Sequence, residues 1–297
     1  MTVQSRVELP GLAKIVPGWR INWALVPIAV GVLSMVIPTL QRVANKSWST
    51  EQGAHGPIVL AIAIWLFVRR WPAIKRHALL GSPWLGGGTL VGALLGYTAA
   101  RIVGSEVLEA AACYGALCAT LYLFVGMGGI RQAWFPILYF LFVLPPPGSV
   151  VAAATQPLRL QISAGAVSLL SMLGLPVAQT GLVIFIEQYT LEVKAACGGL
   201  NSLISLSAIG LFYAYIRHSG DAAYMAVMFC AIVVMAVLAN FIRVILLVLI
   251  TYYLGNEAAQ GFLHQFAGMA MFVIALLGTM AFDGLLGRLW HRRSIPA

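Results

Sequence analysis

Charged residues are scarce in this chain of 297 residues. Only 9% of the residues are Asp, Glu, Lys or Arg, and only nine residues are acidic. Soluble globular domains carry about 25% charged and about 45–50% apolar residues, whereas 61% of this chain is apolar. The shortage of charge excludes a cytosolic enzyme and a disordered chain, and it indicates an integral membrane protein.

Cysteine is also rare, with four residues, at positions 113, 118, 197 and 230. A secreted scaffold held by disulfides needs a higher density of cysteine. None of the four shows C-x-x-C spacing or a histidine at the spacing of a zinc site. We therefore expect no metal site and no cofactor.

Long apolar runs predict an all-α polytopic membrane protein in which residues 1–297 form a single domain with about eight transmembrane helices. A bilayer core requires roughly 20 apolar residues per helix. The first apolar segment has no clear signal-peptidase site after it, so we expect it to remain as a helix. The predicted crossings are 22–40, 57–69, 84–103, 107–126, 132–150, 197–216, 222–239 and 265–287.

Residues 145–196 depart from this pattern. The apolar stretch 158–176 is predicted to lie in the membrane interface. The following segment, GLVIFIEQYTLEV, is rich in β-branched residues and alternates near its end, which predicts a small β-hairpin. We therefore expect an extracytoplasmic or interfacial insertion before the sixth helix.

The distribution of basic residues predicts the orientation. The chain has 18 Lys and Arg residues against nine acidic ones, a net charge of +9 that could indicate nucleic acid or anionic lipid. With the N-terminal segment 1–21 and the loop 69–77 in the cytoplasm, 12 basic residues lie inside and six outside. This bias predicts two cytoplasmic ends, including a tail at 288–297, and explains the charge without a nucleic-acid partner.

Two groups of glycines have structural interpretations. Gly88, Gly92 and Gly96 recur every four residues in the third predicted helix and favour close approach of another helix. Gly126, Gly128 and Gly129 are predicted to end the fourth helix. They lack the Lys-Ser/Thr pair of a phosphate-binding loop.

Cys197 is the strongest candidate for a chemical role. It lies at the predicted start of the sixth helix, where helix N-terminal amides favour a thiolate, the nucleophilic form of cysteine. Gly198 and Gly199 leave room beside the sulfur for a substrate backbone. The alternative is an apolar packing role, which we assign to the other three cysteines.

Arg243 strengthens this hypothesis. It is surrounded by apolar residues in LANFIRVILLVLI, where a charge is costly and by default indicates a functional site. The predicted topology places it at the outer end of the seventh helix, on the same side as Cys197. Asn240 shares its helical face and is a candidate supporting residue. The alternative is an arginine that only fixes the depth of the helix.

Two histidines are expected on the side of Cys197 and Arg243. His264 opens the eighth predicted helix and is suited to accept the thiol proton and return it to a leaving amine. His55 and Gly56 follow the first outer loop and are candidates for positioning a substrate or acceptor. For each histidine the alternative is an interfacial or loop residue without a catalytic role.

Three segments together resemble the exosortase/archaeosortase family of polytopic membrane cysteine transpeptidases: LEVKAACGGLNSLISLSAIGLFYAYI, LANFIRVILLVLITYYLG and GFLHQFAGM. The resemblance extends to AHGPIVLAIAIWLFVRRW, FLFVLPPPG and LGLPVAQTGLVIFI. It implies that Cys197, Arg243 and His264 form a catalytic triad. The family motif more often reads Cys-Ser-Gly-Leu-Arg, whereas Gly198 and Asn201 stand here, which suggests a divergent subfamily.

The resemblance also implies an activity. The expected enzyme lies in a bacterial inner membrane, with its active site on the extracytoplasmic face. Its partners are exported proteins with a C-terminal sorting signal, typically Pro-Glu-Pro, a transmembrane helix and a basic tail. It cuts near that motif through a thioester on Cys197 and transfers the product to an envelope acceptor. The alternatives are a multi-pass transporter and a non-catalytic assembly factor for envelope polysaccharide.

Overall fold

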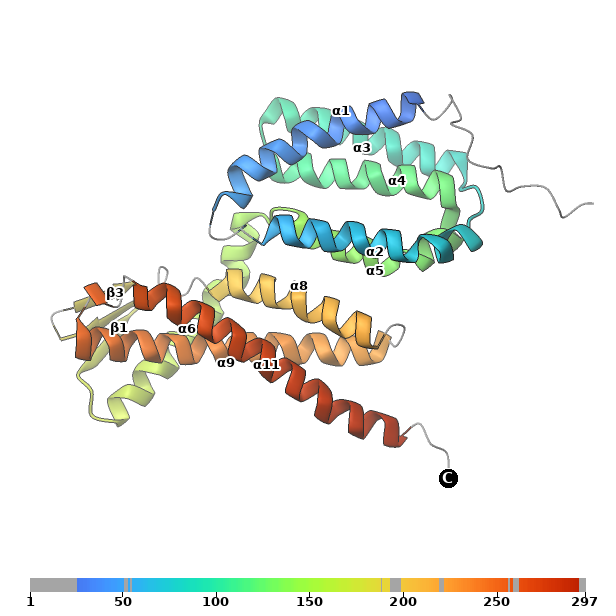
Figure 1. The fold of residues 1–297 in the computed structure, drawn as a ribbon. Coiled ribbons are helices and arrows are strands. Elements are labelled where there is room, and N and C mark those ends of the chain that lie inside the picture. Colours follow the sequence, from blue (N-terminus) through green and yellow to red (C-terminus); the bar gives the residue numbers. More distant parts are fainter. Residues whose placement is uncertain are drawn as a thin grey trace, which may run out of the picture.

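The computed structural model describes residues 26–50, 53, 55–187, 189–192, 199–218, 222–255, 257–258 and 262–293. Most of these residues are helical. Figure 1 shows long helices that run side by side in one general direction, with a small sheet at one end.

The long helices form an N-terminal and a C-terminal group, joined by a middle pair (Figure 1). The N-terminal group consists of α1 (Val26–Val43), α3 (Pro83–Val103) and α4 (Glu106–Gln132). The middle pair is α2 (Gly56–Arg76) and the short α5 (Trp134–Phe140). The C-terminal group is α8 (Gly199–Arg217), α9 (Ala222–Leu254) and α11 (Phe262–Arg293), in which each helix contacts the other two.

Seven of the eight predicted crossings overlap one helix each, whereas 132–150 contains the short α5, a 3₁₀ turn and the start of α6 (Gly148–Met172). Fewer than eight segments of the described chain qualify as membrane spans. Among the described residues, five helices are long and apolar enough to cross a membrane. A sixth is added if Trp134–Val143 and Gly148–Met172, bent by 92°, are counted as one span. Helix α3 is not among these five, because its glycines and Arg101 lower its mean hydropathy. The apolar part of α8, Ile204–Arg217, is too short to be counted. The eight crossings therefore stay a prediction.

Helix α9 is longer than its sequence suggested. It has 33 residues and continues for eleven residues beyond Arg243, whereas the prediction ended it at residue 239. The sequence after Arg243 is apolar and forms helix readily, and one arginine does not interrupt a helix. Arg243 is therefore in the interior of α9 and not at its end, which corrects the expectation from sequence.

The insertion before α8 contains a helix and a sheet. Most of the stretch 158–176, which was expected to lie in the membrane interface, belongs to helix α6 (Gly148–Met172), and its position in the membrane stays a prediction. Strands β1 (Val177–Thr180), β2 (Val183–Ile186) and β3 (Tyr189–Glu192) form an antiparallel sheet in the order β1-β2-β3, one strand more than the expected hairpin. Which side of the membrane the sheet occupies stays a prediction.

A hydrophobic core joins this insertion to the last third of α9. Ile184 and Ile186 of β2 are fully buried against Val244, Leu247 and Val248 of α9. Residues of α6 complete the same core. Helix α6 and the sheet therefore cover the part of α9 that follows Arg243, on a face that would otherwise remain apolar and open.

The glycines of the third and fourth predicted helices behave differently from expectation. A Cβ added at Gly88 or Gly92 would meet nothing within 4 Å, and one at Gly96 would only reach Ala112 at 3.8 Å. The close approach of α3 and α4 is at Gly86 instead, beside Leu123. The glycine ladder therefore does not serve helix packing within this structure.

Gly126 kinks α4 instead of ending it. Its backbone has φ 59° and ψ −170°, a conformation open essentially to glycine alone, and the helix continues to Gln132. The kink frees carbonyl groups that the α2–α3 connection uses: Leu79 N–H donates to Val125 O at 3.2 Å, and Gly81 N–H donates to Leu123 O at 3.2 Å. A Cβ at position 126 would collide with the Leu79 carbonyl oxygen.

We expect Gly126→Ala to destabilise the protein by about 1–3 kcal/mol, because it adds a backbone conformation of high energy and a steric clash. The measurement is thermal unfolding of the detergent-purified chain. Gly87→Ala is the matched control, since Gly87 lies in a helix and an added Cβ meets nothing within 4 Å. Equal melting temperatures for the two variants would contradict this interpretation.

A buried carboxylate holds α1, α3 and α4 together. Glu109 is 1% exposed and accepts hydrogen bonds from Arg42, Arg101 and Thr39, each at 2.9 Å. Glu109 lies in the first turn of α4, where a carboxylate also interacts favourably with the helix dipole. The structure shows ion pairs to Arg42, 67 positions earlier in the chain, and to Arg101, eight positions earlier, so Glu109 has a structural role between three helices.

Glu109→Gln is expected to lower the free energy of unfolding by about 2–3 kcal/mol, because two arginines lose their counter-charge in a poorly hydrated site. Glu106→Gln serves as the control, since an amide oxygen can still accept the hydrogen bond from Ser47 Oγ. Thermal unfolding of both variants in detergent tests this. A Glu106→Gln variant that melts as low as Glu109→Gln would argue against a special role for Glu109.

Candidate active site

Arg243 is buried where the three helices of the C-terminal group meet. Its side chain is only 8% exposed. With Asn240, one turn earlier on α9, it lines a cavity of about 20 Å³, which we call the Arg243 cavity. The remaining lining residues come from α8, α9 and α11: Leu206, Ala236, Ala239, Met271, Phe272 and Ala275. The expectation that Asn240 and Arg243 share a face of the helix is confirmed.

The register of the helices determines what lies level with Arg243. Helix α9 is antiparallel to α8 and to α11 (Figure 1). Position 210 of α8 lies against Ile232 of α9, since a Cβ added there would be 2.6 Å from Ile232 Cδ1. Eleven residues separate Ile232 from Arg243, and eleven separate Gly210 from Gly199. The backbone of Arg243 is therefore about level with the start of α8.

The same reasoning applies to α11. An added Cβ at Gly278 would lie 3.4 Å from Met235 Sδ. Counting eight residues along each helix brings Arg243 level with residue 270. His264 is six residues further towards the start of α11, about 9 Å along the helix axis. The backbones of Arg243 and His264 therefore lie in the same end of this three-helix group.

The other residues of the predicted site are only partly covered. Cys197 and Gly198 lie outside the described residues, and the description resumes at Gly199, the first residue of α8. Asn201 is in the first turn of α8 and His264 is the third residue of α11. The side chains of Asn201 and His264 are outside the described part, so their contacts with Arg243 stay a prediction.

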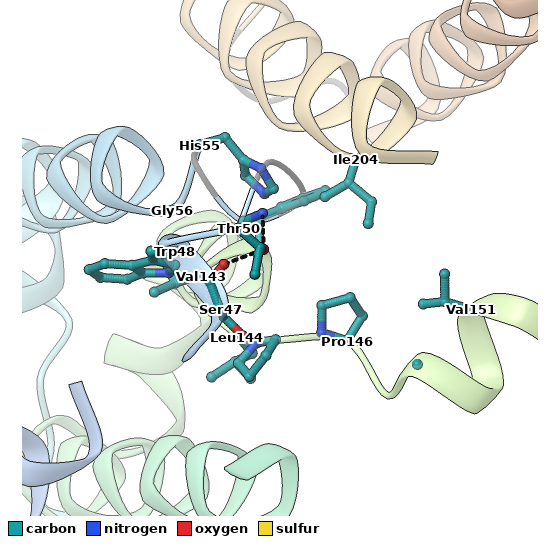
Figure 2. Close-up of a pocket in the computed structure, with 14 residues that line it drawn as sticks. Ser47, Trp48, Thr50, His55, Gly56, Val143, Leu144, Pro146, Val151 and Ile204 are labelled. Atoms are coloured by element: carbon teal, nitrogen blue, oxygen red, sulfur yellow. Dashed lines mark hydrogen bonds between the residues drawn. The ribbon is translucent and has the colours of Figure 1, made fainter. Parts of the chain in front are cut away.

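His55 lines a second cavity, of about 170 Å³, which we call the His55 pocket. Figure 2 shows that side chains from separate segments surround it. His55 and Gly56 come from the start of α2, Trp48 from the π-helical turn Ala44–Trp48, Pro146 from the Pro-Pro-Pro connection before α6, and Ile204 from α8. Three regions that are distant in sequence, residues 47–56, residues 142–151 and Ile204, therefore meet here.

Local hydrogen bonds give the wall of this pocket a defined shape. Thr50 Oγ1 donates to Ser47 O at 2.6 Å, and Ser47 Oγ donates to Glu106 Oε1 at 3.0 Å. The indole of Trp48 packs directly against Gly56, so that any side chain at position 56 would displace it. The resulting pocket offers hydroxyl and imidazole groups beside apolar walls, which suits a short peptide segment.

The two cavities are separate but border the same helix. His55 does not line the Arg243 cavity, so the structure does not bring all the predicted site residues into one cavity. Ile204 lines the His55 pocket and Leu206 lines the Arg243 cavity, both in the first half of α8. Sequence reasoning identified His55 and Gly56 but missed the other walls of the pocket. The sequence feature that could have indicated this part of the wall is the run of three prolines, residues 145–147, which ends a helix.

A polar cluster at the opposite end of the C-terminal group was also missed. Asp283 of α11 is 1% exposed and is in contact with Tyr213, Tyr224, Arg217 and His218 at distances up to 3.1 Å. These partners come from α8, its following turn and α9. Because the carboxylate is satisfied on every side, we assign it the structural role of joining the three helices.

No group of three or more His, Cys, Asp or Glu residues with the spacing of a metal site occurs in the part of the chain that the structure describes. In comparisons with known proteins, the family model described as "Transmembrane exosortase" matches residues 48–281. The matched range includes positions 197, 243 and 264 and every residue that lines the two cavities except Ser47. No curated protein and no solved structure matches the chain.

Proposed function

Because the chain belongs to the transmembrane exosortase family, we propose that it is a cysteine protease and transpeptidase that removes C-terminal sorting signals from exported proteins. The nucleophile is Cys197, and Arg243 and His264 complete the site. The transfer step attaches the trimmed protein to an acceptor in the cell envelope.

The burial of Arg243 between α8 and α11 carries this proposal. An arginine in an apolar helix is costly unless it serves a site, and α9 presents this one to a cavity between two other helices. Cys197 is joined through Gly198 to the first residue of α8, and His264 belongs to α11. The family's three reactive residue types are therefore associated with three helices that pack on one another.

In the first step, Cys197 Sγ attacks the scissile carbonyl carbon. A sulfur–carbon bond forms, the carbon–nitrogen bond breaks, and the thiol proton passes through His264 to the departing amine. Arg243 stabilises the negative charge that develops on the carbonyl oxygen. A poorly hydrated site strengthens this interaction, and the planar guanidinium offers two parallel donors.

In the second step, an amine, a hydroxyl group or water attacks the thioester. The sulfur–carbon bond breaks, His264 takes the proton of the nucleophile, and the Cys197 thiol is restored. Asn240 shares the Arg243 cavity and supports the orientation of the guanidinium. The His55 pocket is close enough to α8 to hold part of the substrate or the acceptor.

The length of α9 fits an active site at one boundary of a bilayer, and the distribution of basic residues predicts that this is the extracytoplasmic boundary of a bacterial inner membrane. From Ala222 to Arg243 the helix rises about 32 Å, close to the roughly 30 Å of a hydrocarbon core. With the α8–α9 turn at the cytoplasmic boundary, Arg243 reaches the opposite boundary. The remaining part of α9, which α6 and the sheet cover, then extends outside the bilayer.

The experiment that tests this function compares the C-termini of envelope and secreted proteins in cells that have or lack the chain. We expect a set of proteins to keep an uncut C-terminal helix and basic tail only in the cells that lack it. Identical C-termini in both kinds of cell would overturn the proposal and favour the transporter or the assembly factor.

A further inference from the structure

An apolar groove of about 480 Å³ lies between α5 and the C-terminal group. All the residues that line it are apolar: Trp134, Leu138, Leu141, Phe142, Leu211, Met225, Ala226 and Phe229. Leu138, Leu141 and Phe229 are 41–47% exposed, so the groove opens outwards from the bundle. A segment that occupies this groove within a bilayer must be apolar, and its backbone groups must be hydrogen-bonded internally. A peptide segment meets this second requirement as a helix.

The groove continues into the His55 pocket. Phe142 lines both cavities, and α8 contributes Ile204 to the pocket and Leu211 to the groove. These two residues are seven positions apart, two turns on one face of the helix and about 10 Å along its axis. An occupant that follows α8 therefore leaves the apolar groove and enters a pocket with hydrogen-bonding groups, near the start of α8.

We propose that the groove and the His55 pocket form one binding track for the sorting signal. The groove holds the transmembrane helix of the signal, and the pocket holds the short segment that precedes this helix. This inference rests on the proposed function and specifies where its substrate binds. Because the groove adjoins a pocket with polar groups, we favour a helix joined to a polar segment as its occupant. An isolated lipid acyl chain has no polar group that could interact with His55, Ser47 and Thr50.

The glycine-lined face of α3 was the other candidate for the substrate helix. Gly87, Gly88 and Gly92 have open space beside them, as a docking helix would need. This face borders neither the groove nor the His55 pocket, and α3 packs mainly against α4. It therefore serves as the control surface in the tests.

Photo-crosslinking tests the location of the helix. A benzophenone amino acid replaces Leu138 in the groove or Leu94 on α3, residues that are 41% and 43% exposed. The chain also carries Cys197→Ala, so that the substrate stays uncut. The probe is a reporter protein that ends in Pro-Glu-Pro, an apolar helix of about 20 residues and three arginines.

We expect the reporter helix to crosslink at position 138 and not at position 94. Equal crosslinking at both positions, crosslinking only at position 94, or capture of lipid alone at position 138 would overturn the inference. Because these chains cannot cut the probe, docking is measured independently of catalysis. If the proposed function fails while the track is correct, the native chain leaves the probe uncut but position 138 still crosslinks.

Filling the groove tests the same inference by activity. Ala226 is exposed in the groove, and Ala99 is an exposed alanine on α3. We expect Ala226→Phe to raise the KM for cleavage of the signal about tenfold, equivalent to about 1.4 kcal/mol of lost binding, and to leave kcat nearly unchanged. Ala99→Phe should have no effect. Equal KM values for the two variants, at equal abundance in the membrane, would overturn the track.

Position 148 allows a graded test of the pocket. Gly148 lines the His55 pocket, and a Cβ added there meets nothing within 4 Å. Both Gly148→Ala and Gly148→Phe should therefore melt at the native temperature, and we expect KM to rise only slightly in the first variant and about tenfold in the second. A native KM in the Gly148→Phe variant would remove the pocket from the track.

Discussion

Cys197→Ala is expected to reduce cleavage of the sorting signal to the uncatalysed rate, a loss on the order of 10⁴-fold or more. The physical reason is that no other group in the proposed site can form the acyl intermediate. The substrates are the proteins whose uncut C-termini appear when the chain is absent. The measurement is the fraction of each substrate that is cut, at equal abundance of the two chains in the membrane.

The other cysteines provide the matched control. Cys113 is buried among α1, α3 and α4, and Cys230 is exposed on α9. Cys230→Ala removes a thiol from the same three-helix group and should leave cleavage at the native rate. If Cys197→Ala retained activity, or if Cys230→Ala abolished it, the assignment of the nucleophile would be wrong.

Arg243→Gln is expected to lower kcat by about 10²–10³-fold, the usual cost of losing one donor that stabilises an oxyanion. Glutamine keeps a hydrogen-bonding group of similar size but has no charge. Arg243→Lys restores the charge without the planar pair of donors, so we expect an intermediate loss. Steady-state cleavage of a purified substrate by membranes that contain each variant gives kcat and KM separately.

Arg217→Gln is the control for the loss of a positive charge from the same group of helices. Arg217 is 58% exposed and pairs with Asp283 at the end opposite to the Arg243 cavity. Its variant should keep the native kcat. If Arg243→Gln raised KM and left kcat unchanged, Arg243 would act in substrate binding. That result would contradict its role in the transition state.

The helices of this protein could be predicted from sequence, but several of their ends could not. Apolar runs of about 20 residues are sufficient to predict membrane helices. The end of α9 was predicted at residue 239 because Asn240 and Arg243 interrupt the apolar run. The structure continues to Leu254, since α6 and the sheet bury the apolar residues that follow Arg243. That burial depends on tertiary contacts that hydropathy does not include.

The candidate site, too, could be predicted from the sequence only in part. The rarity of charge in an apolar helix singled out Arg243, which the structure shows to be buried, and its spacing from Asn240 correctly indicated a shared face. The walls of the His55 pocket come from residues about 90 and 150 positions after His55, and periodicity contains no information on such distant contacts. The ion pair of Glu109 with Arg42, 67 positions earlier in the chain, was missed for the same reason.

The most direct test of the central claim is to capture the thioester on Cys197. The native chain is isolated rapidly from cells that cut their sorting signals, digested, and examined by mass spectrometry with and without neutral hydroxylamine. We predict an acyl group on Cys197 that ends at the cleavage site of a substrate and that hydroxylamine removes. An acyl group on another residue would contradict the account. So would an unmodified Cys197 in both the native chain and the His264→Ala variant, if the cells with the native chain still cut their sorting signals.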